Sequence, residues 1–140
     1  MKSTLDAFSL KGRVAVITGG AGMLGVQHAE AIAEAGGIPV LLDIDSVRVA
    51  MEAKSISKKY KAQTYAVYAD ITDKKHLESA ARIVIGKFGR VDILINNAAS
   101  NPKAEGGFSG WSRFENYDLN SWKREIETGL TGAFLCSQIF

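Results

Sequence analysis

A glycine-rich turn between an apolar run and an alanine-rich run constrains this chain more than any other feature. The stretch from residue 14 to residue 37 reads VAVITGGAGMLGVQHAEAIAEAGG, and seven consecutive positions hold four glycines, Gly19, Gly20, Gly22 and Gly25. A plain turn needs one or two glycines. The surplus therefore predicts a backbone that comes very close to another group, between a buried strand at 13–18 and a helix at 22–36.

The rest of the chain alternates in the same way. Further strands are expected at 38–43, 63–70 and 91–96, and further helices at 46–60, 73–88 and 120–140, with Asn120 as the N-cap of the last helix. Residues 97–119 are rich in Gly, Ser and Asn and read as a loop. Apolar strands separated by helices predict an α/β fold, a Rossmann-like doubly wound parallel sheet of about four strands and four helices. The length of 140 residues suits one domain, 1–140.

Within the turn, residues 20–25 form a G-x-G-x-x-G motif, Gly20-Ala21-Gly22-Met23-Leu24-Gly25. Between a strand and a helix, this spacing is typical of dinucleotide-binding proteins. One glycine makes the tight turn, the next lets the backbone approach a pyrophosphate, and the last allows the helix to pack on the strand. The N–H groups at the start of the helix then face the phosphates. A glycine-rich turn that binds no ligand is the alternative interpretation.

Asp43 at the end of the second strand supports the dinucleotide hypothesis. It stands at about the 20-residue spacing expected of the acid that bonds the adenosine ribose. A carboxylate there favours NAD over NADP, because it repels the additional phosphate, and Ile44 and Asp45 follow it rather than a basic residue. The alternative is that Asp43 caps the next helix, a role that Asp45 or Ser46 could also fill.

Taken together, Thr18-Gly19 with Gly25, then Asp43, Asp70, Asp92 and the NNAA run at 96–99 resemble the short-chain dehydrogenase/reductase superfamily. The resemblance extends from Leu10 to the final LTGAFLCSQ run. It implies an oxidoreductase that moves a hydride between NAD and a carbonyl or alcohol substrate.

The resemblance also implies residue roles. Asn96 would tie the sheet together, and Asp92 would serve the fold. The residues implied to contact the cofactor lie in four places: the phosphate loop (Thr18, Gly19, Gly20, Gly22, Met23, Leu24, Gly25), the ribose site (Asp43, Ile44), the two sides of the adenine ring (Asp70, Ile71) and the NNAA run (Asn97, Ala98, Ala99).

Three positions depart from the family pattern. Met23 stands where the common pattern has a glycine, Ala99 replaces the glycine of NNAG, and Gly129 occupies the place of an asparagine that holds a proton-relay water. A GLTGAFLCS run is also similar to a subset of reductases that modify bacterial surface or flagellar glycans. This similarity implies a sugar-like or polyol-like substrate.

The family's proton-transfer residues are not found in these 140 residues. The family uses Tyr-x-x-x-Lys, because a nearby ammonium lowers the pKa of the phenol, and none of the four tyrosines has lysine at the fourth following position. The serine strand and this motif are expected beyond Phe140, so the second half of the sheet is expected to be absent and the chain alone inactive. A non-catalytic dinucleotide-binding or interaction module is the alternative. The apolar end of the last helix suggests either a self-association surface, and hence a homo-oligomer, or further sequence that covers it.

Other features favour a cytoplasmic protein without nucleic-acid or membrane partners. The net charge is +2, and the lysines and arginines are scattered. The start lacks the apolar segment of a signal peptide, and no run approaches the ~18 apolar residues of a membrane span. His28 and His76 have no neighbouring ligand, so no metal site is expected, and Cys136 reads as a packing residue. Four loop residues either line a substrate pocket or pin the loop to the core, namely Phe108, Trp111, Arg113 and Phe114.

Overall fold

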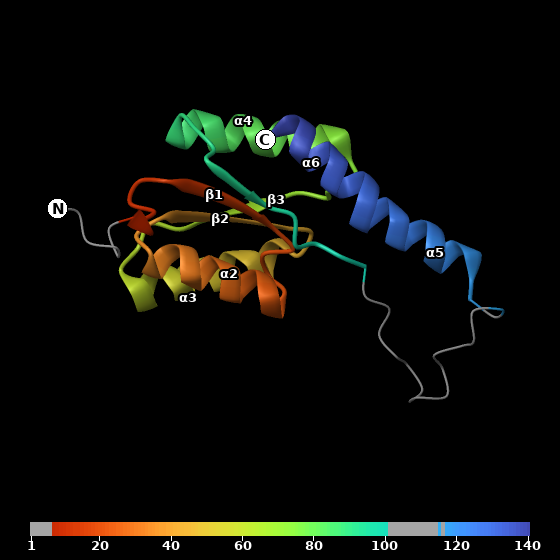
Figure 1. Cartoon of the computed structure of the whole chain (residues 1–140), viewed down its shortest axis with the longest axis horizontal. Coiled ribbons are helices and arrows are strands. Elements are labelled where there is room, and N and C mark those ends of the chain that lie inside the picture. Colours follow the sequence, from red (N-terminus) through yellow and green to blue (C-terminus); the bar gives the residue numbers. More distant parts are fainter. Residues whose placement is uncertain (1–6, 101–114, 116) are drawn as a thin grey trace.

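The computed structural model describes residues 7–100, 115 and 117–140, and these form a layered α/β unit (Figure 1). The first part alternates strands and helices: β1 (Val14–Thr18), α2 (Met23–Glu34), β2 (Ile38–Asp43), α3 (Ser46–Tyr60), β3 (Tyr65–Tyr68), α4 (Lys74–Phe88) and β4 (Ile93–Ile95). The last part is one helical stretch, α5 (Leu119–Ile126), the π-helical segment η3 (Glu127–Gly132) and α6 (Ala133–Ile139).

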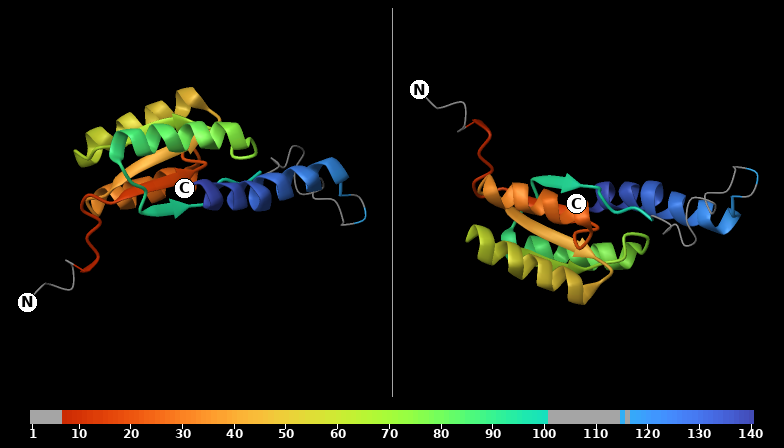
Figure 2. Two further views of the ribbon diagram at one scale, coloured as in Figure 1. Left: turned by 90° about the horizontal axis from the view of Figure 1, so that it is seen from above. Right: turned by 90° about the horizontal axis from the view of Figure 1, so that it is seen from below.

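The four strands form one parallel sheet in the order β3-β2-β1-β4. Helices α2 and α3 cover one face, and α4 and α6 cover the other, while α5 extends past the end of the sheet (Figures 1 and 2). This arrangement confirms the doubly wound Rossmann-like fold. It brings the carboxyl ends of β1, β2 and β4 to one edge, where Thr18 pairs with Leu42 and Ile17 pairs with Ile95.

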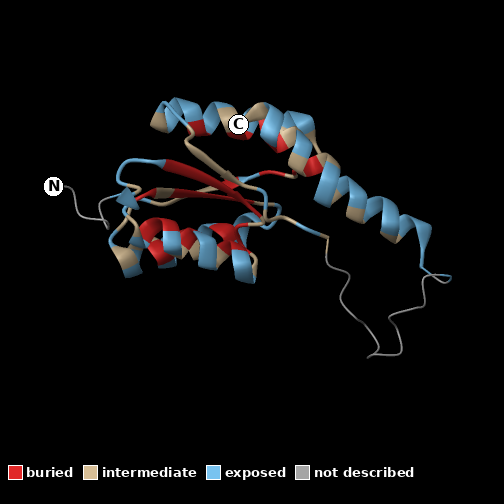
Figure 3. Ribbon diagram, in the orientation of Figure 1, coloured by how far each residue is buried: buried red, intermediate tan, exposed pale blue. Residues whose placement is uncertain are grey.

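Two buried apolar clusters hold the layers together (Figure 3). Alternate residues of a strand point to opposite faces, so Val14 and Val16 pack toward α4 and α6, whereas Ile17 packs toward α2 and α3. Both faces of β1 and β2 are therefore buried, and each fully buried aliphatic side chain contributes about 1.5–3 kcal/mol. This is why these strands read as continuous apolar runs instead of alternating patterns.

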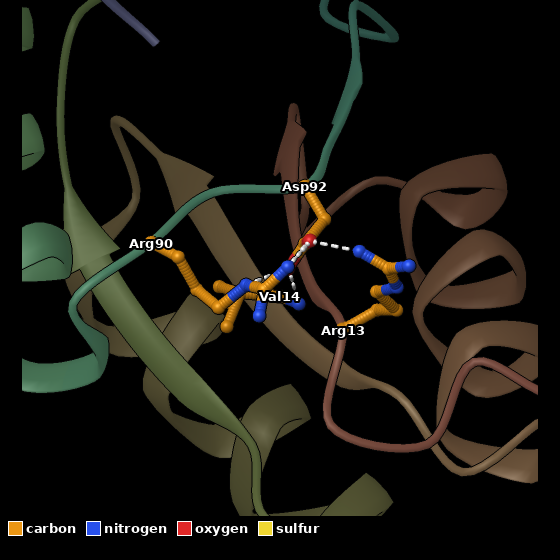
Figure 4. Close-up of polar contacts among 4 residues, drawn as sticks. All are labelled: Arg13, Val14, Arg90 and Asp92. Atoms are coloured by element: carbon orange, nitrogen blue, oxygen red, sulfur yellow. Dashed lines mark hydrogen bonds and ion pairs between the residues drawn. The ribbon is translucent and has the colours of Figure 1, made fainter.

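A buried carboxylate joins the start of β4 to the start of β1 (Figure 4). The side chain of Asp92 is only 7% exposed, and it accepts hydrogen bonds from Nε of Arg90 (2.8 Å), from the backbone N–H of Val14 (2.9 Å) and from Nη1 of Arg13 (2.7 Å). These donors, Arg90 first, hold the pKa of Asp92 well below its usual range. These contacts agree with the expected role of Asp92 in the fold.

The end of the chain differs from the sequence-based expectation in two ways. The N-cap of the last helix is Asp118, whose carboxylate accepts a hydrogen bond from the backbone N–H of Ser121 (2.8 Å), so the prediction of Asn120 was wrong. That hydrogen bond also lowers the pKa of Asp118. The expected helix at 120–140 is helical, but η3 interrupts its regular α-helical hydrogen bonding.

Candidate functional site

A pocket of about 810 Å³ lies at the carboxyl ends of the strands, between the glycine-rich turn and the last helix. Most of the residues expected to contact a cofactor line it: Gly19, Gly22, Met23, Leu24, Asp43, Ile44, Asp70, Ile71, Asn97, Ala98 and Ala99. Three of the expected residues, Thr18, Gly20 and Gly25, do not line the pocket. Their contacts show that they shape the turn beneath it.

The glycines of the turn are held at contact distance from the backbone around them. A Cβ atom on Gly20 would lie 2.6 Å from Cβ of Leu41, and one on Gly25 would lie 2.2 Å from the carbonyl oxygen of Gly19. Gly19 itself has φ +62°, a conformation that side chains disfavour. The turn is therefore closely packed, as its surplus of glycines predicts. Gly22 lies at the pocket as the N-cap of α2.

The start of α2 suits an anion. The first helical turn carries no acidic side chain, and no side chain caps its N–H groups. Such N–H groups and the positive end of the helix dipole attract phosphate. Because Gly22 has no Cβ, a phosphate can approach the backbone closely at this point.

Thr18 fixes the strand-end loop that forms one wall of the pocket. Its side chain is buried (1% exposed), and its hydroxyl accepts hydrogen bonds from the backbone N–H groups of Asn97 and Ala98, both at 3.0 Å. The side chain of Asn97 donates in return to the carbonyl oxygens of Thr18 (2.9 Å) and Gly19 (3.2 Å). Thr18 therefore lies beneath the pocket and is not one of its lining residues.

The tie that was expected at Asn96 is made by its neighbour Asn97. Asn96 is exposed and donates from its side chain to the hydroxyl of Ser137 on α6, 3.2 Å away. The alternation of side chains at the end of β4 decides which of two adjacent asparagines faces β1. The NNAA run by itself does not distinguish them.

Asp43 is held rigidly at the pocket. One carboxylate oxygen accepts from the backbone N–H of Ala21 (3.0 Å), and the other accepts from the N–H of Asp45 (3.0 Å). Asp45, whose side chain accepts from the N–H of Arg48 (2.9 Å), is the N-cap of α3, so the alternative that Asp43 caps this helix is wrong. Each carboxylate oxygen of Asp43 keeps a further lone pair for a ligand hydroxyl.

Asp70 and Ile71 form the next wall. The carboxylate of Asp70 accepts hydrogen bonds from the backbone N–H (2.9 Å) and the hydroxyl (2.7 Å) of Thr72, which closes a local turn after β3. Ile71 is 7% exposed and belongs to the core cluster under α4 and α6. The floor of the pocket is thus continuous with the core.

Seven lining residues were missed by the sequence analysis. Leu42, Ala69 and Thr72 lie beside residues that were expected. The other four are Lys123, Arg124, Glu127 and Thr128. They come from α5 and η3, far along the chain from the glycine motif. No local motif marks them, and the alignment of the LTG run with the family was the one signal that could have placed this helix beside the cofactor. Lys123, Arg124 and Glu127 bring charged side chains to this wall of the pocket.

Other expectations can be placed as well. Among the described residues there is no group of three or more His, Cys, Asp and Glu side chains that could hold a metal ion, and no described helix has the length and apolarity to span a membrane. Cys136 is fully buried, and burial raises the pKa of its thiol to about 11. Phe108, Trp111, Arg113 and Phe114 lie outside the described residues.

The proteins to which this chain is similar are described as dehydrogenases, reductases or oxidoreductases. The family model described as short chain dehydrogenase matches residues 13–140. An uncharacterized oxidoreductase, UxuB, of Bacillus subtilis (strain 168) is 36% identical over 143 residues, which cover 94% of this chain and 50% of that protein. The chain therefore spans about half the length of this curated relative.

Two solved structures carry the same fold with different cofactors in their descriptions. The NADPH-dependent 3-quinuclidinone reductase from Rhodotorula rubra superposes with a TM-score of 0.82 at 30% identity, over 99% of this chain and 49% of that one. An NAD⁺-bound xylitol dehydrogenase superposes with a TM-score of 0.81 at 25% identity, over 93% of this chain and 47% of that one. Both likenesses are to about half of the known chain.

Proposed function

The chain belongs to the short-chain dehydrogenase family, and on this premise we propose that it supplies the cofactor-binding part of an NAD-dependent oxidoreductase. The observation that carries the proposal is the carboxylate of Asp43, fixed at the pocket by the N–H groups of Ala21 and Asp45. When bound, the nicotinamide ring accepts or gives the hydride, and the substrate is a carbonyl compound or the corresponding alcohol.

The residues of the pocket fit a dinucleotide in a definite order. The start of α2 at Gly22 and Met23 would take the pyrophosphate, since its N–H groups have no side-chain cap. Asp43, with Ile44 beside it, would accept hydrogen bonds from the adenosine ribose. Asp70 and Ile71 would lie along the adenine ring, and the wall formed by Asn97, Ala98 and Ala99 would continue toward the nicotinamide.

Asp43 also supports NAD as the preferred cofactor. A carboxylate accepts from two ribose hydroxyls, whereas the additional phosphate of NADP brings a second negative charge to the same place. Relatives of this fold use either cofactor, so the preference rests on this chain's own carboxylate. Lys123 and Arg124 also line the pocket, on the helix wall formed by α5.

The substrate class is proposed from the family and from one relative. The description of xylitol dehydrogenase names a polyol, which agrees with a sugar-like or polyol-like substrate for this chain. The similarity to reductases of bacterial surface glycans stays a prediction, as does the cytoplasmic location. Hydride transfer itself would belong to the whole protein, because the Tyr-x-x-x-Lys motif does not occur in these residues.

We also propose that a second copy of the chain covers the last helix. Five large apolar side chains are exposed at three- and four-residue spacing along it, from Leu119 through Trp122, Ile126 and Leu130 to Phe134. This spacing places them along one stripe of a helix, and a continuous apolar stripe in water favours association. Sedimentation equilibrium tests this proposal, since Phe134→Glu is expected to shift the mass toward that of a single chain.

The experiment that tests the cofactor proposal is direct calorimetric titration with NAD, NADP and AMP. Binding of NAD and AMP, with weaker binding of NADP, is the expected result. A non-catalytic dinucleotide-binding module is the alternative, and it predicts binding without turnover by the whole protein. Lack of binding of all three nucleotides would refute both candidates.

A further inference from the structure

Gly132, the last residue of η3, touches the floor of the pocket from below. It is buried, and a Cβ atom built on it would lie 2.6 Å from Cδ1 and 2.8 Å from Cγ1 of Ile71. Two carbon atoms that are not bonded to each other do not come this close, so one of the two groups would have to shift. Any side chain at position 132 must therefore move Ile71.

Ile71 lies between the packed core and the pocket. Its backbone is fixed by the turn in which the N–H and the hydroxyl of Thr72 donate to Asp70 and the N–H of Asp73 donates to the carbonyl of Asp70. Behind it the side chain belongs to the close-packed cluster that contains Leu77 and Cys136, both fully buried. Ile71 also lines the pocket, so its side chain is in contact with open space there.

A glycine inside a helix also needs an explanation, because alanine is about 0.8–1.0 kcal/mol more favourable there. The same helical segment offers an internal comparison. Gly129 is exposed, and a Cβ atom on it would meet nothing within 4 Å. Of these two glycines of η3, Gly132 alone has a steric reason to lack a side chain, and that reason is Ile71.

We propose that Gly132 is a positioning residue of the cofactor site, which keeps Ile71 withdrawn so that the adenine half of the pocket stays open. This inference rests on the proposed dinucleotide function. Gly132 does not line the pocket, so it acts through Ile71. A helix that carried a methyl group at this point would push Ile71 into the space where the adenine ring is expected.

The test compares two identical substitutions in one segment, Gly132→Ala and Gly129→Ala, by titration with AMP and NAD. Overpacking of this size is expected to weaken nucleotide binding by about tenfold in Gly132→Ala. Gly129→Ala is expected to bind like the unmodified chain. Equal binding by the two folded variants, with thermal unfolding as the check on folding, would overturn the proposal.

A second pair of variants removes the dependence on how well Gly132→Ala folds. Ile71→Ala deletes both atoms that the new methyl group would meet, so adding Gly132→Ala to it should cost no further AMP affinity. A tenfold loss in the double variant relative to Ile71→Ala would show that Gly132 acts otherwise and would overturn the inference. If the unmodified chain binds no nucleotide, the proposed function fails and this inference fails with it. If the unmodified chain and Gly129→Ala bind AMP and only Gly132→Ala binds it more weakly, the inference about Gly132 is supported.

Discussion

The carboxylate of Asp43 accepts a hydrogen bond from the backbone N–H of Ala21 at 3.0 Å, and this contact ties the end of β2 to the glycine-rich turn. This side chain thus joins two segments that each contribute to the pocket. The same carboxylate is the group proposed to distinguish NAD from NADP. Its structural and its selective roles can be separated by a substitution that keeps its shape.

Asp43→Asn removes the charge and retains one oxygen that can accept from Ala21 or Asp45. A hydrogen bond to a charged group contributes about 1.5–3 kcal/mol, so NAD is expected to bind about tenfold or more weakly. NADP binding should be unchanged or stronger, because the repulsion of its additional phosphate is lost. Calorimetric titration of both cofactors measures the ratio. Asp45→Asn, a matched change outside the pocket, should leave that ratio as it is, and equal losses for both cofactors in Asp43→Asn would contradict the assignment.

Thr18→Val keeps the shape of a buried residue and deletes its hydroxyl. The N–H groups of Asn97 and Ala98 then lose their acceptor inside the protein, and an unsatisfied buried donor costs about 1–3 kcal/mol. The free energy of unfolding in urea is expected to fall by about this amount, and nucleotide binding should weaken as the wall of the pocket loosens. Thr18→Ser retains the hydroxyl and serves as the control. If Thr18→Ser loses as much stability as Thr18→Val, the lost hydrogen bonds are not the cause of the destabilisation.

Gly25→Ala and Gly86→Ala make the same change in two helices, but the first is expected to be harmful and the second stabilising. A Cβ atom on Gly25 would lie 2.2 Å from the carbonyl oxygen of Gly19, and neither backbone segment can move cheaply, so nucleotide binding should be lost. Gly86 on α4 is exposed and a Cβ atom there meets nothing, so alanine should raise stability by about 0.8–1.0 kcal/mol through helix propensity. Thermal unfolding and AMP titration measure both effects. Retained nucleotide binding in folded Gly25→Ala would refute the close-packing argument.

Asp92 makes stability depend on acid. Its pKa lies below the ordinary value of 3.8 because Arg90, the N–H of Val14 and Arg13 all favour the charged carboxylate. A depressed pKa contributes stability that is fully present above pH 3.8 and is lost as the pH falls toward the folded-state value. Asp92→Asn should therefore be less stable at neutral pH, and its melting temperature should fall less between pH 4 and pH 2. If the melting temperatures of the two proteins fall by the same amount between pH 4 and pH 2, Asp92 is not the group responsible for the loss of stability.

The sequence was sufficient for the fold because its strongest signals are local. The apolar runs of β1 and β2 are buried on both faces, and the order of strands and helices leaves few topologies. The pocket followed for the same reason: the glycine motif and Asp43 stand at the ends of adjacent strands. Nothing local could show that α5 and η3 would bring Lys123 and Thr128 to the opposite wall, since that depends on how the helix crosses the sheet.

Two misses have similarly physical causes. Asn120 and Asp118 are both good N-caps, and the difference between them is only which one reaches a free N–H, here that of Ser121. The π-helical segment depends on hydrogen bonds that skip one residue further than usual, and an apolar periodicity does not reveal this. The same segment holds Gly132, whose role emerges only from its distance to Ile71.

The strand order also determines how long β1 stays without its second neighbour during synthesis, because β4 is made last and pairs with β1. The hydroxyl of Thr18 accepts a hydrogen bond from the backbone N–H of Asn97, which is synthesised 79 residues later. At a synthesis rate of about 5–20 residues per second, β1 spends on the order of 4–16 seconds with one edge unpaired. During that time β2 can already pair with one edge of β1, and α2 can pack on one face of it. The other edge has no partner until β4 is made, so it is open to a chaperone or to another nascent chain of this protein on the same messenger RNA.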